Sequence, residues 1–134
     1  LDCDFSGGDF CGYYESRTDN FDWSLGSGPI SSTNTGPASD HTTGSGNYIY
    51  IESALPRRPG DKAVLVSAVM APTVGDNCLR FWYHMYGLSI NTLNVYIVTG
   101  PGVYNSKRIW TRSLSQGNSW HLAEAPVSSN ITWQ

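Results

Sequence analysis

The fold class is decided by the stretch Cys78-Leu-Arg-Phe-Trp-Tyr-His-Met-Tyr-Gly87, which is followed after a short break by Thr92-Leu-Asn-Val-Tyr-Ile-Val98. Both segments alternate with a period of two, which is typical of a β-strand, because successive side chains of a strand point to opposite faces. In the first segment one predicted face carries Leu79, Phe81, Tyr83 and Met85, and the other carries Arg80, Trp82, His84 and Tyr86. In the second segment the alternation predicts that Leu93, Val95 and Ile97 point inward.

Further strands are predicted on both sides of this stretch. Asn47–Ser53 alternates Tyr48 and Tyr50 with Ile49 and Ile51, and bulky residues on both faces indicate burial on both sides. Shorter candidates are Lys62–Met70, Lys107–Arg112 and Ser119–Ala123, whereas residues 1–46 are expected to form long loops with two or three short strands. No window of ten residues shows a clean helical period. We therefore predict an all-β fold, a jelly-roll-like β-sandwich of antiparallel strands in a single domain.

The composition excludes several classes of function. Charged residues make up 14% of the 134 residues and the net charge is −3, so the basic stripe of a nucleic-acid-binding protein is missing. No apolar run approaches the roughly 20 residues of a membrane span, so we expect no membrane insertion by this segment. The chain also lacks a Gly-x-Ser-x-Gly motif, a His-Glu-x-x-His motif and a phosphate-binding loop. We expect a binding module and not an enzyme.

The 3 cysteines leave two interpretations open. Cys3 and Cys11 lie eight positions apart in the chain with Gly7-Gly8 between them, and a loop of this size can close a disulfide without strain. Cys78 is then left over, and in a secreted protein such a cysteine is a free thiol, forms an intermolecular bond or has lost its partner. The cytosolic alternative is that all the thiols are free.

Acidic residues and one sequon are the remaining candidate sites. Asp4 and Asp40 belong to a loop-rich region, where aspartates most often cap turns by accepting hydrogen bonds from their own backbone. The alternative is a Ca²⁺ site built from carboxylates and loop carbonyls, with Asp40 and Asp4 as weak candidates. The triplet Asn130-Ile-Thr132 is a glycosylation sequon, so in a secreted protein Asn130 is expected to face solvent.

Arg80, Trp82 and Tyr86 are the candidate interaction residues, because Arg, Trp and Tyr dominate binding hot spots. The same alternation also fits the second packed face of a sandwich strand, which we favour. Joint exposure of Trp82, Tyr86 and Trp110 in one groove would instead favour a carbohydrate-binding module.

Several blocks of the chain, taken in order, resemble the MAM domain, an ectodomain module of meprins, neuropilins and mu-type receptor tyrosine phosphatases. These blocks are Cys3-Asp-Phe5, Cys11-Gly12, Phe21-Asp-Trp23, Gly36-Pro-x-x-Asp-His-Thr42, Gly46-x-Tyr-x-Tyr-x-Glu52, residues 78–87, Thr92-Leu-Asn-Val-Tyr96 and Gln116-Gly-x-x-Trp120. The resemblance covers nearly the whole chain.

The resemblance implies a jelly-roll-like β-sandwich that serves adhesion, receptor assembly or oligomerisation without catalysis. It implies a disulfide between Cys3 and Cys11, and a partner for Cys78 near the C-terminal end of the family's domain. The family continues past the position of Gln134, so we interpret residues 1–134 as one MAM-like domain that lacks the family's last strands and leaves Cys78 unpaired. A sheet edge is then expected to stay open to another chain.

The resemblance also bears on a cation. Several members of the family bind a cation, and Asp40 matches a residue that lies near their cation. Ser6 stands where the family often has Glu, and a late Asp of the family lies beyond Gln134.

The leading hypothesis is an extracellular or cell-surface recognition module that binds a protein partner, including a second copy of itself. The alternatives are a carbohydrate-binding jelly-roll module and an accessory domain of a secreted metalloprotease. No cofactor is expected apart from Ca²⁺.

Overall fold

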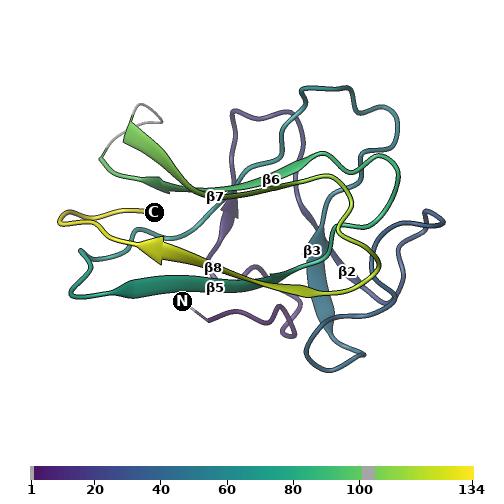
Figure 1. Ribbon diagram of the computed structural model, residues 1–134, viewed down its shortest axis with the longest axis horizontal. Helices are drawn as coiled ribbons and strands as arrows, with labels where there is room; N and C mark the ends of the chain where they lie inside the picture. Colours follow the sequence, from purple (N-terminus) through teal and green to yellow (C-terminus); the bar gives the residue numbers. More distant parts are fainter. Residues whose placement is uncertain (1, 101–104) are drawn as a thin grey trace.

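The computed structural model describes residues 2–100 and 105–134, and it is all-β with antiparallel strands, as the sequence predicts (Figure 1). The strands pair two by two, β1 with β4, β2 with β3, β5 with β8, and β6 with β7. Their bounds are β1 Tyr14–Glu15, β2 Ser24–Ser27, β3 Asn47–Tyr50, β4 Leu65–Val66, β5 Asn77–Tyr83, β6 Thr92–Val98, β7 Ser106–Ser113 and β8 His121–Val127.

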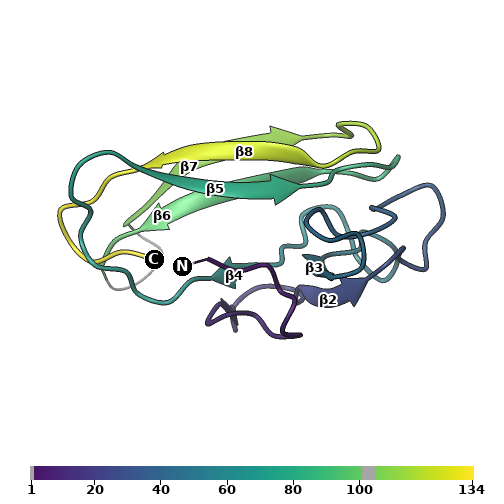
Figure 2. The same cartoon turned by 90° about the horizontal axis from the view of Figure 1, so that it is seen from below.

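The strands lie in two layers. Figure 2 shows β5, β6, β7 and β8 in its upper half, and β2, β3 and β4 in its lower half. The long loops of the first 46 residues contain only β1 and β2, which confirms the prediction of a few short strands there. The two long pairs of the upper layer are in contact through β7 and β8.

The core lies against one face of β5. Tyr83, Met85 and Ala123 form a buried cluster, and the partly buried side chains packed against it are Phe81, Ile90, Leu93 and Trp110. The Trp110 ring meets the rings of Phe81 and Tyr83 edge-on, each at 5.1 Å between centroids. Ile97 of β6 is also buried. The alternation predicted for β5 and β6 is therefore confirmed.

Two of the shorter predicted strands differ from the observed ones. The candidate Lys62–Met70 shrinks to β4, because side chains of a neighbouring loop take its backbone donors: Asp19 Oδ2 accepts the Val64 N–H at 2.6 Å and Asn20 Oδ1 accepts the Lys62 N–H at 2.9 Å. The candidate Ser119–Ala123 starts later and runs further, as β8, because residues 117–119 form a turn closed by the Ser119 N–H and the Gly117 carbonyl.

The prediction that Asn47–Ser53 is buried on both sides is wrong for its last apolar residue. Tyr48 is buried, but Ile51 lies beyond the end of β3 and is 43% exposed. Burial here follows the strand pairing, which ends at Tyr50 opposite Ser24.

Candidate functional site

The face of β5 and β8 that points away from the core cluster is called here the outer face. Trp82 lies directly opposite Leu122 in the antiparallel register, and Arg80 lies opposite Glu124. Residues directly opposite each other in an antiparallel pair place their side chains in contact. Arg80 Nε and Glu124 Oε1 form an ion pair at 2.8 Å. The outer face is thus an apolar pair beside a charged pair.

The apolar pair is open to solvent. Trp82 is 45% exposed and Leu122 is 49% exposed, although both lie within regular strands. The imidazole of His41 stacks on the Trp82 ring at 3.6 Å between centroids, with an angle of 16° between the planes. The indole is therefore held in one orientation while much of its surface remains available to a partner.

Trp120 supports the loop that presents His41. The Trp120 Nε1–H donates to the Ser39 carbonyl at 3.0 Å, and its ring meets His41, Tyr48 and His84 at centroid distances of 6.3, 6.0 and 5.5 Å. Tyr48 belongs to β3, so Trp120 links the loop that carries His41 to the β2–β3 pair. A rigid support of this kind lowers the entropy lost when a partner binds.

His84 lies beside Trp120 and is partly buried. Its Nε2 is 3.1 Å from Asn118 Oδ1, an acceptor, so we assign the proton to Nε2. Nδ1 is buried and has no hydrogen-bond partner among the described residues. Burial lowers the pKa of His84, the bond to Asn118 opposes this shift, and His121 adds to it.

Asp40 organises the loop that carries His41. Its carboxylate accepts the backbone N–H groups of Thr42, Thr43 and Gly46 at 2.9, 2.7 and 2.7 Å, and also the Thr43 hydroxyl. These bonds, led by the Thr43 N–H, lower the pKa of Asp40. These bonds confirm the prediction that Asp40 caps a turn.

Asp4 has a similar local role, since its Oδ1 accepts the N–H and the hydroxyl of Ser6 at 3.0 and 2.7 Å. Ca²⁺ needs six to eight oxygens. In the part of the chain that the structure describes, no three His, Cys, Asp or Glu side chains come together as metal ligands would. Asp4 and Asp40 thus serve as local hydrogen-bond acceptors, and Ca²⁺ binding stays a prediction.

The other aromatic candidates lie elsewhere. Trp110 packs in the core against Phe81, on the opposite face of β5 from Trp82. Tyr86 lies past the end of β5, where its carbonyl accepts the Gly36 N–H and the Thr35 hydroxyl. The structure therefore does not bring Trp82, Tyr86 and Trp110 into one groove, and the carbohydrate-binding alternative loses the feature on which it depended.

The cysteines and the sequon have clear positions. Cys3 and Cys11 are joined by a disulfide with their Cα atoms 5.8 Å apart, as the family resemblance implies. Cys78 is a free and exposed cysteine at the start of β5. Asn130 is exposed in a bend after β8. Its position leaves room for a glycan, and glycosylation stays a prediction.

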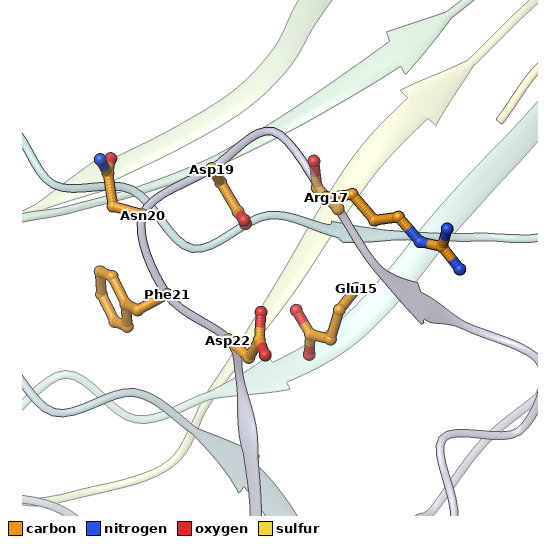
Figure 3. A pocket seen from close by; sticks show the side chains of 7 residues that line it. Glu15, Arg17, Asp19, Asn20, Phe21 and Asp22 are labelled. Carbon is orange, nitrogen blue, oxygen red and sulfur yellow. The ribbon is translucent and has the colours of Figure 1, made fainter.

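An acidic hollow lies beside β1, and Figure 3 shows the carboxylates of Glu15 and Asp22 pointing toward each other across it. Glu15 Oε1 accepts the Trp23 N–H at 3.1 Å, while Oε2 is buried and has no partner among the described residues. Burial raises the pKa of Glu15, the bond from Trp23 opposes this, and the negative charges of Asp22 and Asp19 add to the rise. The hollow therefore holds a buried carboxylate oxygen of Glu15 beside the negative charges of Asp22 and Asp19.

From the sequence, Trp82 and Arg80 were interaction candidates for which packing was favoured, whereas His41, Leu122 and Glu124 were not named. Leu122 and Glu124 could have been predicted to share a face, because they alternate with buried residues along β8. Their register against β5 depends on how the chain closes over some 38 residues and has no local signal. The stacking of His41 on Trp82 likewise joins residues 41 positions apart.

Comparisons of the sequence with known proteins identify its family. The family model described as "MAM domain, meprin/A5/mu" matches residues 3–134. The chain is similar to MAM domain-containing glycosylphosphatidylinositol anchor protein 1 of Homo sapiens, with 37% identity over 137 residues that cover 98% of this chain and 14% of that protein.

Two further relatives are similar over comparable lengths. Anchor protein 2 of Mus musculus is 36% identical over 145 residues, which cover 98% of this chain and 15% of that protein, and thyroid hormone-induced protein B of Xenopus laevis is 35% identical over 127 residues, covering 95% and 18%. The chain thus spans less than a fifth of the length of these relatives. Within residues 2–100 and 105–134, no helix has the length and hydropathy needed to cross a membrane.

Proposed function

The chain belongs to the MAM domain family, and from that membership we propose that it is a non-catalytic extracellular recognition module that binds a protein partner through the outer face of β5 and β8. The relatives named as glycosylphosphatidylinositol anchor proteins support a place at the cell surface. The Cys3–Cys11 disulfide supports an oxidising compartment.

The observation that carries this proposal is the half-exposed pair of Trp82 and Leu122 on regular strands. Soluble proteins expose single apolar residues commonly, but a stacked indole opposite a leucine, bordered by an ion pair, is the pattern of an interface centre with a polar rim. The stacking of His41 and the bond from Trp120 to Ser39 fix this surface before a partner arrives. Binding would therefore cost little reorganisation.

The proposal is tested with purified chain multimerised on fluorescent beads and applied to cultured cells. We expect bead binding that is lost after the cells are treated with a protease and kept after they are treated with glycosidases. Retention after protease and loss after glycosidases would instead support the carbohydrate-binding alternative. Aggregation of the beads with each other, in the absence of cells, would identify the partner as a second copy of this chain.

The surface is tested with Trp82→Ser and Leu122→Ser. Truncating a central Trp costs about 2 kcal/mol or more at an interface, so Trp82→Ser should weaken binding by about 30-fold. Leu88→Ser is the matched control, because Leu88 is fully exposed on a loop outside β5 and β8. Equal binding by all three variants would mean that the partner binds elsewhere.

An accessory role in a larger secreted protein, including a protease, concerns the whole protein and is compatible with a binding surface here. It would be supported if the multimerised chain bound a further domain of the same protein and bound no cells.

A further inference from the structure

Charge is divided unevenly between the two parts of the chain. Residues 2–76, which contain β1 to β4, hold ten acidic and four basic side chains. Residues 77–134, which contain β5 to β8, hold four basic side chains and a single acidic one. The net charge of −3 thus combines −6 in the first part with +3 in the second. The layer that presents the outer face is therefore positive in a protein that is negative as a whole.

The positive charge of this layer is concentrated on β7. Arg80 of β5 is paired with Glu124 of β8, and β6 has no charged side chain. The remaining basic side chains are exposed and all belong to β7: Lys107, Arg108 and Arg112. In the part of the chain that the structure describes, none of the three forms an ion pair. We call these three side chains the β7 cations.

Arg108 points to the same side of the layer as the outer face. It lies opposite Tyr96 in the register of β6 and β7, and residues directly opposite each other project from one face of a sheet. Tyr96 is half-exposed and precedes the buried Ile97, so Tyr96 and Arg108 point away from the core. Trp110, further along β7, packs in the core against Phe81 of β5. The core sides of β5 and β7 therefore coincide, and so do their outward sides.

Lys107 and Arg112 lie toward the two ends of β7. The guanidinium of Arg112 lies 5.6 Å from the centroid of the Trp110 ring. A cation over an indole at this distance is attracted to the ring, which restrains the side chain without neutralising its charge. At about 3.3 Å per residue, Lys107 and Arg112 are at most roughly 17 Å apart along the strand. The β7 cations thus cover nearly the whole length of β7.

The positive strand is next to the apolar pair of the outer face. β7 and β8 are in contact, and Leu122 of β8 lies opposite Trp82 of β5. β7 ends at Ser113 and β8 begins at His121, so Arg112 and Leu122 lie at the same end of the layer. Figure 1 shows β7 leading into β8 at that end. A partner that covers Trp82 and Leu122 therefore meets the β7 cations on one flank.

We propose that the partner of the outer face is an acidic protein, whose apolar centre covers Trp82 and Leu122 and whose carboxylates lie along the β7 cations. This inference rests on the proposed function, which assigns the outer face to a protein, and it adds the chemistry of that protein. Opposite potentials across an interface steer the encounter and fix the orientation of the partners. Like charges placed opposite each other cost free energy, so the same field rejects basic partners.

Two other anionic occupants fit the surface less well. A sulfated polysaccharide would neutralise the β7 cations, but it offers no apolar group to cover Leu122, whereas a protein interface combines an apolar centre with a polar rim. A second copy of this chain has an acidic first part, but several of its carboxylates already accept backbone N–H groups. These are Asp9, Asp19, Asp40 and Asp61.

The test compares two triple variants in the assay of bead binding to cells. The β7 variant carries Lys107→Gln, Arg108→Gln and Arg112→Gln. The matched control carries Arg17→Gln, Arg58→Gln and Lys62→Gln, which remove the same charge from exposed side chains of the first part of the chain. Exposed charge pairs contribute up to about 1 kcal/mol each, so the β7 variant should bind about fivefold more weakly or less. The control should bind within about twofold of the wild type.

Two further measurements identify the cause of a loss. Raising the NaCl concentration from about 50 to about 300 mM should weaken binding by the wild type and the control, and should change binding by the β7 variant little, because salt screens exposed charges. In solution, fluorescein-labelled poly-L-glutamate should bind the wild type and the control but not the β7 variant, as followed by fluorescence anisotropy. If the β7 variant fails to fold, Arg108→Gln alone should show part of the loss in both assays.

The outcomes separate this inference from the proposed function. Binding that is lost in Trp82→Ser but equal in the two triple variants would keep the proposed surface and overturn the acidic partner. Binding that is lost in the β7 variant but unchanged in Trp82→Ser would overturn both, because β7 would then bind an anion without the outer face. Loss of bead binding after heparan sulfate lyase treatment of the cells would assign the β7 cations to a sulfated polysaccharide and overturn the protein partner.

Discussion

Replacement of Trp120 should be among the most damaging single changes outside the core cluster. Trp120 is half-buried, meets three rings and donates one hydrogen bond to the Ser39 carbonyl at 3.0 Å. A hydrogen bond of this kind contributes about 1 kcal/mol, and each aromatic pair contributes about 0.5–1.5 kcal/mol beyond its buried area. Trp120→Phe keeps most ring contacts and should cost about 2 kcal/mol, whereas Trp120→Ala should cost about 4 kcal/mol.

The assay is thermal unfolding followed by circular dichroism. For a chain of this length, 1 kcal/mol corresponds to about 4 °C in Tm, so we expect losses of about 8 °C for Trp120→Phe and about 15 °C for Trp120→Ala. Trp23→Phe is the matched control, because the Trp23 indole donates a comparable bond to the Ala63 carbonyl at 3.3 Å without such a ring cluster. The reasoning fails if Trp120→Ala lowers Tm no more than Trp23→Phe does.

Three further predictions concern groups with unusual surroundings. Folding lowers the pKa of His84, so the neutral imidazole contributes fully to stability above about pH 6.5. This contribution is lost as the pH falls through the pKa of the folded state. Urea titrations from pH 7.5 to 5 should therefore show a fall in the free energy of unfolding that is smaller in His84→Gln. Glu15→Gln should raise Tm at pH 7 by a few degrees, since it removes a negative charge that lies beside Asp22 and Asp19 while keeping an acceptor for the Trp23 N–H; an unchanged or lower Tm would contradict this. Alkylation of the unreduced chain with iodoacetamide should add one carbamidomethyl group by intact mass, at the free Cys78, and the addition of three would contradict the Cys3–Cys11 disulfide and the extracellular assignment.

The long strands could be predicted from the sequence because their signal is local. The alternation in Thr92–Val98 predicts both ends of β6, and the alternation of β5 separates the face of Tyr83 from the face of Trp82. The packing favoured for the second face is wrong for Trp82, which is 45% exposed. Burial of Tyr83 and Met85 follows from the same pattern.

The remaining features depend on contacts between distant residues. β4 is short because Asp19 and Asn20 take its donors, and nothing near residue 62 in the sequence indicates this. The interaction candidates Arg80 and Trp82 were named from the β5 segment alone, so the residues opposite them on β8 and the stacked His41 were missed. Family resemblance supplied the Cys3–Cys11 pairing, which spacing alone left open.

The pairing of β5 with β8 has a consequence for the order of assembly. Tyr83 pairs with His121, and the chain between them contains the whole of β6 and β7. A hairpin closes in microseconds from neighbours in sequence, whereas a contact across some 38 residues must first overcome a larger loop entropy. The β6–β7 hairpin should therefore form early and shorten the effective distance for β5 and β8. Until that closure, the uncharged edge of β6 is exposed on the nascent chain, so synthesis conditions that delay closure should favour self-association over folding.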